Sequence, residues 1–571
     1  MRFQLLHIND THSHFEPTPV SFQLDIEGMH VQVQTQSGGY ARLKSAITKC
    51  QQQSKLTSLF LHAGDSFQGT TYFSKFKGLA NAHLLNQLMP DAMTLGNHEF
   101  DLGNGPVRTF LDEVKFPTLS GNMDLSQEDP NKLTALSGHD LLYDYDPKAK
   151  IAKVLKKEID GQTLAIFGIT IDRIKDISFP DEDTLFHNAI ETTQRTIDAL
   201  HAQGIRRILV LSHLGYAGDL ELADKVKGIS IIVGGHSHTL QGEFADFGLD
   251  ARPYGEMVNN TAVLQAGKFA ETLGIGDVEI DENGHCIRCE GSSYFLLSNT
   301  ETLFVDAKHD AILSEVKQAV FQHAGVMEIE PDKSIEAYIE QKLKPAIDEM
   351  DNNVITTVAD RLEVQRIPDE QRPEGCQVSP LVAQAMYMFA SQQVSPLHFG
   401  LYNAGGSRVP LPAGDLTEAE IMGRLIPFAC SVVYFKVAGK HLRHALECAI
   451  DNATDNGIQG SGTGSFPYGF NLRYEYQGDQ PQDQRLTRLE VKDDQGQWVP
   501  VKDDAYYGGV SSSYTAAGKE GYDGLNHAVA REDLGTECAV AFIEFARALD
   551  TLSPNEEKAV FYHPPRRHQS E

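Results

Sequence analysis

The chain has 571 residues, of which 41% are hydrophobic and 22% are charged, a composition typical of soluble globular proteins. Its formal net charge of −30 at pH 7 repels nucleic-acid backbones and anionic membranes, which argues against a polyanion-binding role. A chain of this length is expected to divide into about two to four domains.

The features that bear on the compartment favour the cytoplasm. No apolar run reaches the roughly eighteen residues that a membrane-spanning helix needs. The first apolar run stops at Asp10, where a signal peptide would continue, so no signal peptide is expected. The seven cysteines are scattered and odd in number, which suits a reducing compartment. We therefore expect a cytoplasmic protein without a membrane or nucleic-acid partner, while its oligomeric state stays open.

The first predicted strand, residues 3–8, is followed by Asp10 and His12. If the strand continued through them, these two side chains would project from the same face near its carboxyl end. Open α/β sheets place their ligands at that end, and a carboxylate beside an imidazole can hold a divalent metal. Residues 15–37 are polar and contain proline and several glutamines, which predicts a long loop.

Strands and helices then alternate, which predicts an α/β layered domain. The predicted strands lie at 56–63, 92–95, 162–170, 207–211 and 229–233, and the helices at 41–53, 78–88, 189–203 and 220–226. Residues 121–150 are expected to form an irregular, polar insertion.

Polar side chains recur where these strands end. The endings are Asn9-Asp10-Thr11-His12, Gly64-Asp65, Gly96-Asn97-His98, Ser212-His213 and Gly235-His236-Ser237-His238. A single histidine after a strand is more often structural than a ligand. Five such endings are hard to explain by packing, because unpaired polar groups are costly to bury.

The chain changes character near residue 300. Helices are predicted at 306–321 and 334–350, and the charged second helix is interpreted as an interdomain linker. The expected domains are therefore 1–330, a linker at 331–351, and 352–560, followed by a disordered tail at 561–571. The second domain is predicted to contain helices at 381–393, 417–425 and 440–452, and strands at 432–437, 470–476, 485–492 and 505–512.

The strand endings, in this order and with Glu99-Phe100-Asp101 after His98, resemble the calcineurin-like metallophosphoesterase superfamily. Within it, the chain is similar to the bacterial 5′-nucleotidase / UDP-sugar hydrolase family, to which the motifs Asn403–Arg408 and Ile426–Phe428 also correspond. The resemblance covers about residues 1–550. It implies an α/β fold, with an N-terminal four-layer α/β/β/α domain, a linker helix and a smaller α+β C-terminal substrate domain.

The resemblance also implies two divalent metal ions, for which Zn, Mn, Co or Fe suit the mixed nitrogen and oxygen ligands. One ion would be held by Asp10, His12, Asp65 and His238, and the other by Asp65, Asn97, His213 and His236. Asp65 would bridge them, as in two-metal sites for in-line displacement. The family often has glutamine at the position of His238, so histidine there can change the preferred metal. His98 would assist catalysis, oriented by Asp101.

In the second domain, the resemblance implies substrate contacts from Asn403, Arg408, Phe428, Tyr514, Glu520 and Arg372. Phe428 and Tyr514 would stack on the base, although both could instead be core aromatics. Glu520 stands where the family has aspartate. The residues after Arg372 also depart from the family turn.

We therefore expect hydrolysis of phosphoesters by a metal-activated hydroxide. Nucleoside 5′-monophosphates are the favoured substrates, with UDP-sugars or cyclic nucleotides as further candidates. The alternatives are a cyclic-nucleotide phosphodiesterase or thiosulfate-ester hydrolase of the same superfamily, or a non-catalytic ligand-binding protein. Two other motifs are given no functional role. Cys286 and Cys289 are predicted to lie on a surface strand. The glycine-rich stretch 460–464 lacks the P-loop lysine and is predicted to be a loop.

Overall fold

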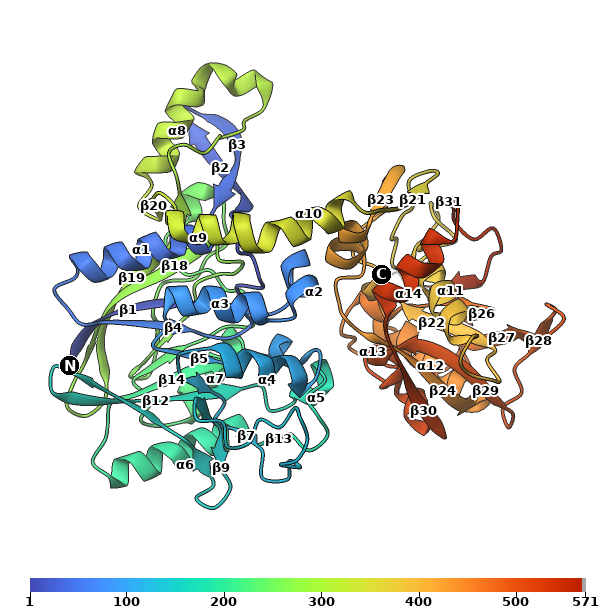
Figure 1. Ribbon diagram of the computed structural model, residues 1–571, viewed down its shortest axis with the longest axis horizontal. Coiled ribbons are helices and arrows are strands. Elements are labelled where there is room, and N and C mark those ends of the chain that lie inside the picture. Colours follow the sequence, from blue (N-terminus) through green and yellow to red (C-terminus); the bar gives the residue numbers. More distant parts are fainter. Residues whose placement is uncertain (567–571) are drawn as a thin grey trace. The chain divides into compact units, whose positions relative to one another are not determined.

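The computed structural model describes residues 1–566, apart from the side chains at 307, 308 and 310. The chain forms two compact units, Met1–Pro345 and Ala346–Glu571, coloured along the sequence in Figure 1. The division falls within a helical segment made of α9 (Lys333–Tyr338), a π-helical turn (Ile339–Leu343) and α10 (Lys344–Asn352). The sequence predicts a linker helix over the same residues.

The first unit contains two large sheets, each of which includes a run of parallel strands. The first sheet has the order β20 (Val326–Glu328), β19 (Cys286–Leu297), β18 (Thr272–Ile280), β1 (Arg2–Ile8), β4 (Ser58–His62), β5 (Ala92–Thr94), β6 (Thr118–Leu119) and β8 (Leu142–Tyr143). The second has the order β11 (Leu155–Ile159), β12 (Gln162–Thr170), β14 (Ile208–His213), β15 (Ile231–Val233), β17 (Thr261–Leu264) and β16 (Glu256–Val258).

The two sheets pack face to face. Their shared core includes Leu5 and Leu61 from the first sheet and Leu211 and Val233 from the second, all fully buried. Helices cover the outer faces. They are α1 (Tyr40–Gln53), α3 (Leu79–Leu88) and α4 (Asn104–Glu113) on the side of the first sheet, and α6 (Ala189–Ala202) and α7 (Tyr216–Lys225) on the second. The predicted four-layer α/β/β/α fold is therefore confirmed.

The long loop predicted for residues 15–37 is wrong. This segment forms a hairpin of β2 (Thr18–Ile26) and β3 (Met29–Ser37), which turns at Gly28 with a φ of 81°. Alternate residues such as Val20, Phe22 and Val33 are buried, whereas the polar residues between them face solvent. The segment therefore has the two-residue period of a half-buried strand, which its polar composition concealed.

The second unit is α+β, as predicted. Its central sheet has the order β25 (Pro467–Phe470), β22 (Phe399–Asn403), β29 (Tyr506–Ser512), β24 (Ser431–Ala438) and β30 (Ala530–Glu537). The helices α11 (Ser379–Ala390), α12 (Gly439–Thr454) and α14 (Cys538–Arg547) pack on it. Two smaller sheets complete the unit. The first has the order β23 (Gly414–Thr417), β21 (Val354–Val358) and β31 (Thr551–Leu552). The second has the order β28 (Trp498–Pro500), β27 (Leu486–Lys492), β26 (Leu472–Gln477) and β32 (Val560–His563).

The predicted disordered tail, residues 561–571, is wrong at its start. Strand β32 extends to His563, because Phe561 and its neighbours pair with β26. Residues 567–571 lie outside the described part of the chain. Among the residues that the structure describes, no helix is long and apolar enough to cross a membrane.

Candidate metal centre

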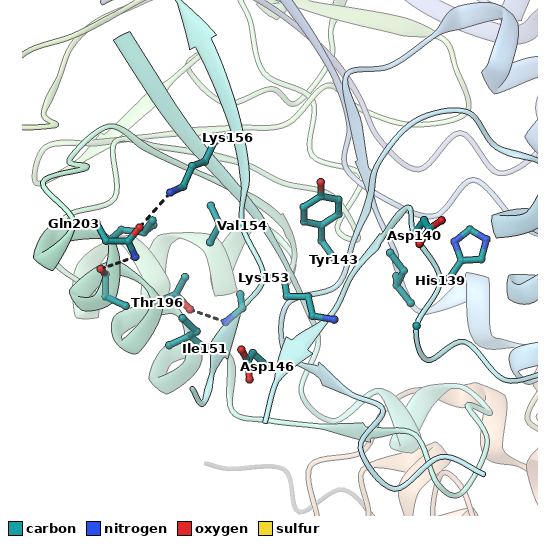
Figure 2. A pocket seen from close by; sticks show the side chains of 15 residues that line it. His139, Asp140, Tyr143, Asp146, Ile151, Lys153, Val154, Lys156, Thr196 and Gln203 are labelled. Atoms are coloured by element: carbon teal, nitrogen blue, oxygen red, sulfur yellow. Dashed lines mark hydrogen bonds between the residues drawn. The ribbon is translucent and has the colours of Figure 1, made fainter. Parts of the chain in front are cut away.

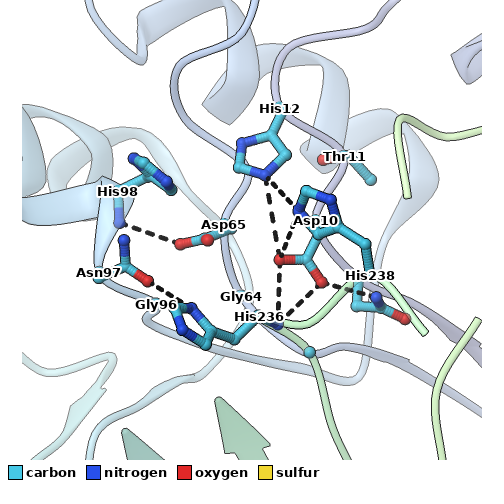
Figure 3. Close-up of polar contacts among 12 residues, drawn as sticks. Asp10, Thr11, His12, Gly64, Asp65, Gly96, Asn97, His98, His236 and His238 are labelled. Carbon is cyan, nitrogen blue, oxygen red and sulfur yellow. Dashed lines mark hydrogen bonds and ion pairs between the residues drawn. The ribbon is translucent and has the colours of Figure 1, made fainter. Parts of the chain in front are cut away.

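The predicted ligands meet at the carboxyl ends of strands from both sheets of the first unit (Figure 3). Asp10 and His12 do not continue strand β1 as expected, because β1 ends at Ile8. Both adopt left-handed backbone conformations, with φ of 50° and 45°. Asp65, His236 and His238 also have positive φ, at 56°, 73° and 56°. Each such residue costs about 1–3 kcal/mol, and strained conformations of this kind cluster at functional sites.

Asp10, His12 and His238 form the first candidate ligand group. Each offers one ligand atom, and these atoms lie within 4.8 Å of one another. His12 Nδ1 lies 2.9 Å from the carbonyl oxygen of Phe67, which can only accept a hydrogen bond. In a neutral imidazole, Nε2 of His12 therefore carries a lone pair, and it faces Nε2 of His238 at 3.2 Å. Burial lowers the pKa of His12 to about 3 and that of His238 to about 4, which favours the neutral form that metals bind.

Asp65, His213 and His236 form the second group within the same limit. His213 Nδ1 lies 2.7 Å from Ala63 O, so Nε2 is left facing Asp65 Oδ2 at 3.0 Å. That nitrogen is buried and has no hydrogen bond of acceptable geometry in the described chain. Asn97 Oδ1 lies 2.9 Å from His236 Nδ1 and adds a fourth oxygen or nitrogen donor. Ring nitrogens, an amide oxygen and a carboxylate that face one another in this way are the donor types that a divalent cation binds once the imidazoles are neutral.

The pKa of His213 shows how negative this position is. Burial is the largest single influence and lowers that pKa, but the charges of Asp65 and Asp10 and the hydrogen bonds of the ring together outweigh it and raise the pKa to about 10. The same negative potential would attract a divalent cation. The chemistry and placement of the donors therefore fit divalent metal ions.

His98 lies beside both groups. Its Nδ1 is 2.6 Å from Asp101 Oδ2, and its backbone N–H donates to Asp65 Oδ1 at 3.0 Å. Asp101 is itself held by Gln68 Nε2 at 3.0 Å and Ser178 Oγ at 2.7 Å. Although burial lowers it, the charges of Asp101 and Asp65 raise the pKa of His98 to about 10. The predicted contact between His98 and Asp101 is present, while their catalytic roles stay a prediction.

Glu99 is an important residue of the site to which the sequence analysis gave no role. Its fully buried carboxylate accepts hydrogen bonds from the backbone N–H groups of Asp65, Ser66, Phe67 and Gly96, at 2.7–3.2 Å. It thereby joins the turns that follow β4 and β5. No local pattern identifies this role, because the four donors come from two separate turns.

Replacing Glu99 with alanine is expected to lower the free energy of unfolding of the metal-free protein by about 3 kcal/mol. The reason is that several buried N–H groups would lose a charged acceptor. Urea denaturation after chelator treatment measures the change. The matched control is Glu221→Ala, because Glu221 is exposed and pairs only across one helical turn with Lys225. A Glu99→Ala change as small as that of the control would contradict this structural role.

Phe269 is a second unpredicted neighbour of the site. Its φ is 54°, which is unusual for an aromatic residue, and its N–H donates to Asp10 O at 2.8 Å. Its ring stacks on His14 at 4.2 Å and lies edge-on to His12 and His238 at 5.8 and 5.6 Å. Lys268 Nζ lies 4.7 Å from the same ring. An aromatic wall with an adjacent positive charge therefore borders the first ligand group.

Most of the predicted substrate residues cluster in the second unit. The Arg408 guanidinium lies 5.4 Å from the ring centre of Phe428. Burial raises the pKa of Glu520. A hydrogen bond from Tyr514 and the positive charge of Arg408 lower it in part. Phe428 and Tyr514 are both partly exposed, which disfavours the alternative that they are core aromatics. Asn403 is mostly buried, and its Nδ2 donates to Gly464 O at 3.2 Å.

Arg372 has local partners in the second unit, and its predicted substrate contact stays a prediction. It pairs with Glu363 at 3.5 Å, and its backbone N–H donates to Asp369 Oδ1, which holds it in a local turn. Arg366 lies close enough to the cluster for its positive charge to lower the pKa of both Arg408 and Glu520. Arg366 Nη1 also donates to Thr463 Oγ1 at 3.3 Å, so the glycine-rich loop borders the cluster.

A separate cavity of about 530 Å³ lies between α6 and residues 138–156 (Figure 2). Its lining includes Tyr143, Lys153 and Lys156 but none of the predicted site residues. The amino groups of both lysines already have protein partners, Asp144 for Lys153 and Gln203 for Lys156. The predicted chemistry therefore does not depend on this cavity.

Comparisons with known proteins agree with the geometry. Residues 3–240 match the family described as calcineurin-like phosphoesterase, and residues 354–527 match the 5′-nucleotidase C-terminal domain. A probable 5′-nucleotidase of Treponema pallidum is 32% identical over 95% of this chain and 91% of its own length. An NAD 5′-nucleotidase of Haemophilus influenzae is 29% identical over 91% and 85%. The structure of a 5′-nucleotidase precursor from Thermus thermophilus covers 98% of this chain and 99% of its own, with a TM-score of 0.68 and 28% identity.

Proposed function

This chain belongs to the 5′-nucleotidase family of calcineurin-like phosphoesterases, and on that premise we propose that it hydrolyses nucleoside 5′-monophosphates to nucleoside and phosphate. The observation that carries the proposal is that Asp65 lies in two candidate ligand groups, one with His213 and His236 and one with His12 and His98. His12 also belongs to the group of Asp10 and His238. A carboxylate shared by two cations is typical of sites for in-line displacement at phosphorus. The aromatic and arginine cluster of the second unit supports a nucleotide as the substrate.

Seven side chains would hold the metal ions. Asp10, His12 and His238 would bind one ion together with Asp65, and Asn97, His213 and His236 would bind the other with the same Asp65. When bound, the ions would supply an activated water and positive charge for the phosphoryl oxygens. Zn, Mn, Co and Fe all suit this mixture of imidazole, amide and carboxylate donors.

The proposed catalytic role of His98 is based on its hydrogen bonds. Asp101 accepts from Nδ1, and Nε2, for which the described part of the chain shows no hydrogen bond, can donate toward the substrate. Because its pKa is raised to about 10 in the metal-free site, the imidazole is protonated at neutral pH. We infer that His98 donates a hydrogen bond to a phosphoryl oxygen or to the leaving alkoxide, where negative charge develops.

The second unit would bind the nucleoside and part of the phosphate charge. Phe428 and Tyr514 offer partly exposed rings for stacking on a base, which contributes about 1–3 kcal/mol in nucleic-acid systems. Glu520 would accept from ribose hydroxyl groups. Arg408 and Arg366 would supply positive charge, with Arg366 taking the role that the sequence assigned to Arg372.

Exchanging Arg366 for alanine is expected to raise KM for AMP about 10- to 100-fold, with a smaller effect on kcat. Hydrogen bonds to charged groups contribute about 1.5–3 kcal/mol, and each 1.4 kcal/mol is tenfold in affinity. Arg372→Ala is the matched control and should change KM by less than about threefold, because Arg372 pairs with Glu363. Steady-state kinetics of both variants decide the assignment, and the opposite ranking would restore Arg372.

The proposed activity is tested with a substrate panel on the metal-stripped protein, reconstituted separately with Mn²⁺, Zn²⁺, Co²⁺ and Fe²⁺. The panel contains nucleoside 5′-monophosphates, a UDP-sugar, a cyclic nucleotide, a thiosulfate ester and p-nitrophenyl phosphate. The highest kcat/KM for a nucleoside 5′-monophosphate is expected. A higher value for the cyclic nucleotide or the thiosulfate ester would overturn the proposal in favour of another branch of the superfamily. Absence of turnover with every metal would favour a ligand-binding protein.

A further inference from the structure

Two cysteines at the start of β19 lie on the same face of the strand, although their spacing predicts opposite faces. In the pairing with β18, Cys289 lies opposite Val278 and Cys286 opposite Ile280. The register shifts by one residue between these pairs, so the strand bulges at Ile287. Ile287 is 59% exposed, whereas Val278 and Ile280 are fully buried. The bulge therefore turns both cysteines toward the core between the two sheets.

The two thiols share one environment and influence each other, since each shifts the pKa of the other. Cys286 Sγ donates to Arg288 O at 3.4 Å. Cys286 belongs to the core between the sheets, and Cys289 packs against that core. The prediction of a plain surface strand is thus wrong for these side chains, because the outward position belongs to Ile287.

The surroundings give the two thiols unequal reactivity. The hydrogen bond from Cys289 lowers the pKa of Cys286, whereas the same contact raises the pKa of Cys289. Cys286 is therefore the thiol that forms a thiolate first, as in Cys-x-x-Cys redox sites. Gly255 lies against Cys289, since a Cβ there would come within 2.7 Å of Cys289 Sγ. A glycine at this position leaves room for the sulfur.

We propose that Cys286 and Cys289 form a redox-active dithiol, which a low-molecular-weight disulfide such as oxidised glutathione converts into an intramolecular disulfide. The Cys286 thiolate attacks one sulfur of the oxidant, so the oxidant S–S bond breaks and one glutathione thiolate leaves. Cys289 then attacks Cys286 Sγ in the mixed disulfide and releases the second glutathione. Two protein S–H bonds become one S–S bond, and both protons pass to the two glutathione thiolates.

The other cysteines provide a competing pair. The backbone N–H of Cys538 donates to Cys430 O at 2.9 Å, so these two residues are also neighbours. The Cys538 thiol, however, is directed to Met386 Sδ at 3.5 Å and Ser431 O at 3.7 Å. Burial holds the pKa of Cys538 well above its ordinary value, which disfavours the reactive thiolate. Oxidation should therefore select Cys286 and Cys289.

The test uses the full-length protein, reduced and then incubated with oxidised glutathione. Thiol titration in denaturant should fall from the seven cysteines of the chain to five thiols, because one disulfide consumes two. Peptide mapping without reduction should show the link between Cys286 and Cys289, and dithiothreitol should restore all seven thiols. Seven thiols after oxidation, or a link between Cys430 and Cys538, would overturn the proposal.

Two variants separate the steps. Cys289→Ser should trap glutathione on Cys286 as a stable mixed disulfide, because the thiol that resolves it is absent. Cys430→Ser is the matched control and should still lose two thiols on oxidation. If Cys289→Ser acquires no glutathione at Cys286, the assigned order of attack is wrong. None of these measurements depends on phosphoesterase activity, so the outcome is independent of the proposed function.

Discussion

The substitution Asp65→Asn is expected to lower kcat for AMP or p-nitrophenyl phosphate by at least about three orders of magnitude. Metal ions contribute several kcal/mol to charge stabilisation, and each 1.36 kcal/mol is tenfold in rate. Asp65 is 1% exposed, belongs to the second ligand group, and contacts both His213 and the backbone of His98. Asparagine preserves the shape of the side chain but removes the negative charge shared by both proposed ions.

Phosphate release and metal content, measured on the same preparation, test this expectation. The variant should bind less metal, since the neutral amide is a weaker ligand than the carboxylate. Asp277→Asn is the control, because Asp277 on β18 forms a partly exposed ion pair with Arg2 on the neighbouring strand β1 of the same sheet. An Asp65→Asn enzyme with full metal content and turnover close to wild type would remove Asp65 from the bridging role.

The convergence of the ligands was predictable because it depends on the order of the strands. Asp65, Asn97 and His213 each follow a short apolar strand, and parallel strands of an α/β layer end at one edge. The ligands are brought together by topology, which the alternation of strands and helices reveals. Their left-handed backbone conformations could not be predicted in the same way.

The turn after β1 shows why. Asp10 N donates to Gly64 O at 2.9 Å and His12 N donates to Asp65 O at 3.1 Å. The backbone of this turn is therefore hydrogen-bonded to the backbone of the turn after β4. The two turns are more than fifty residues apart in the sequence. The conformation of Asp10 is therefore set by long-range hydrogen bonds rather than by its neighbours.

Two other features depend on local structure that the residue types do not reveal. The bulge at Ile287 inserts one residue into β19 and moves the side chain of Cys286 to the opposite face of the strand. Strict alternation of side chains along a strand does not predict this change. In the second unit, the turn at Asp369 holds the backbone of Arg372, whose guanidinium pairs with Glu363. Side-chain placement in loops depends on such turns, and the residue types alone do not determine it.

Replacing His98 with alanine is expected to lower kcat by about two to four orders of magnitude while metal content stays close to wild type. A positioned donor or acid contributes this much to phosphoryl transfer, and the seven proposed ligands remain in place. Asp101→Asn should give a smaller loss, because His98 would keep Nε2 but lose the carboxylate that orients and charges it.

The pH profile distinguishes a proton-donating His98 from a merely structural one. Because its pKa is raised, the protonated form is present at neutral pH and is lost as the pH rises through that pKa. Cations at Asp65 would lower the value from about 10, since the raised pKa depends partly on the charge of Asp65. We expect kcat of the wild type to fall on the alkaline side below pH 10, and His98→Ala to lose that limb. An identical alkaline limb in both proteins would assign the titration to another group and leave His98 only a structural part.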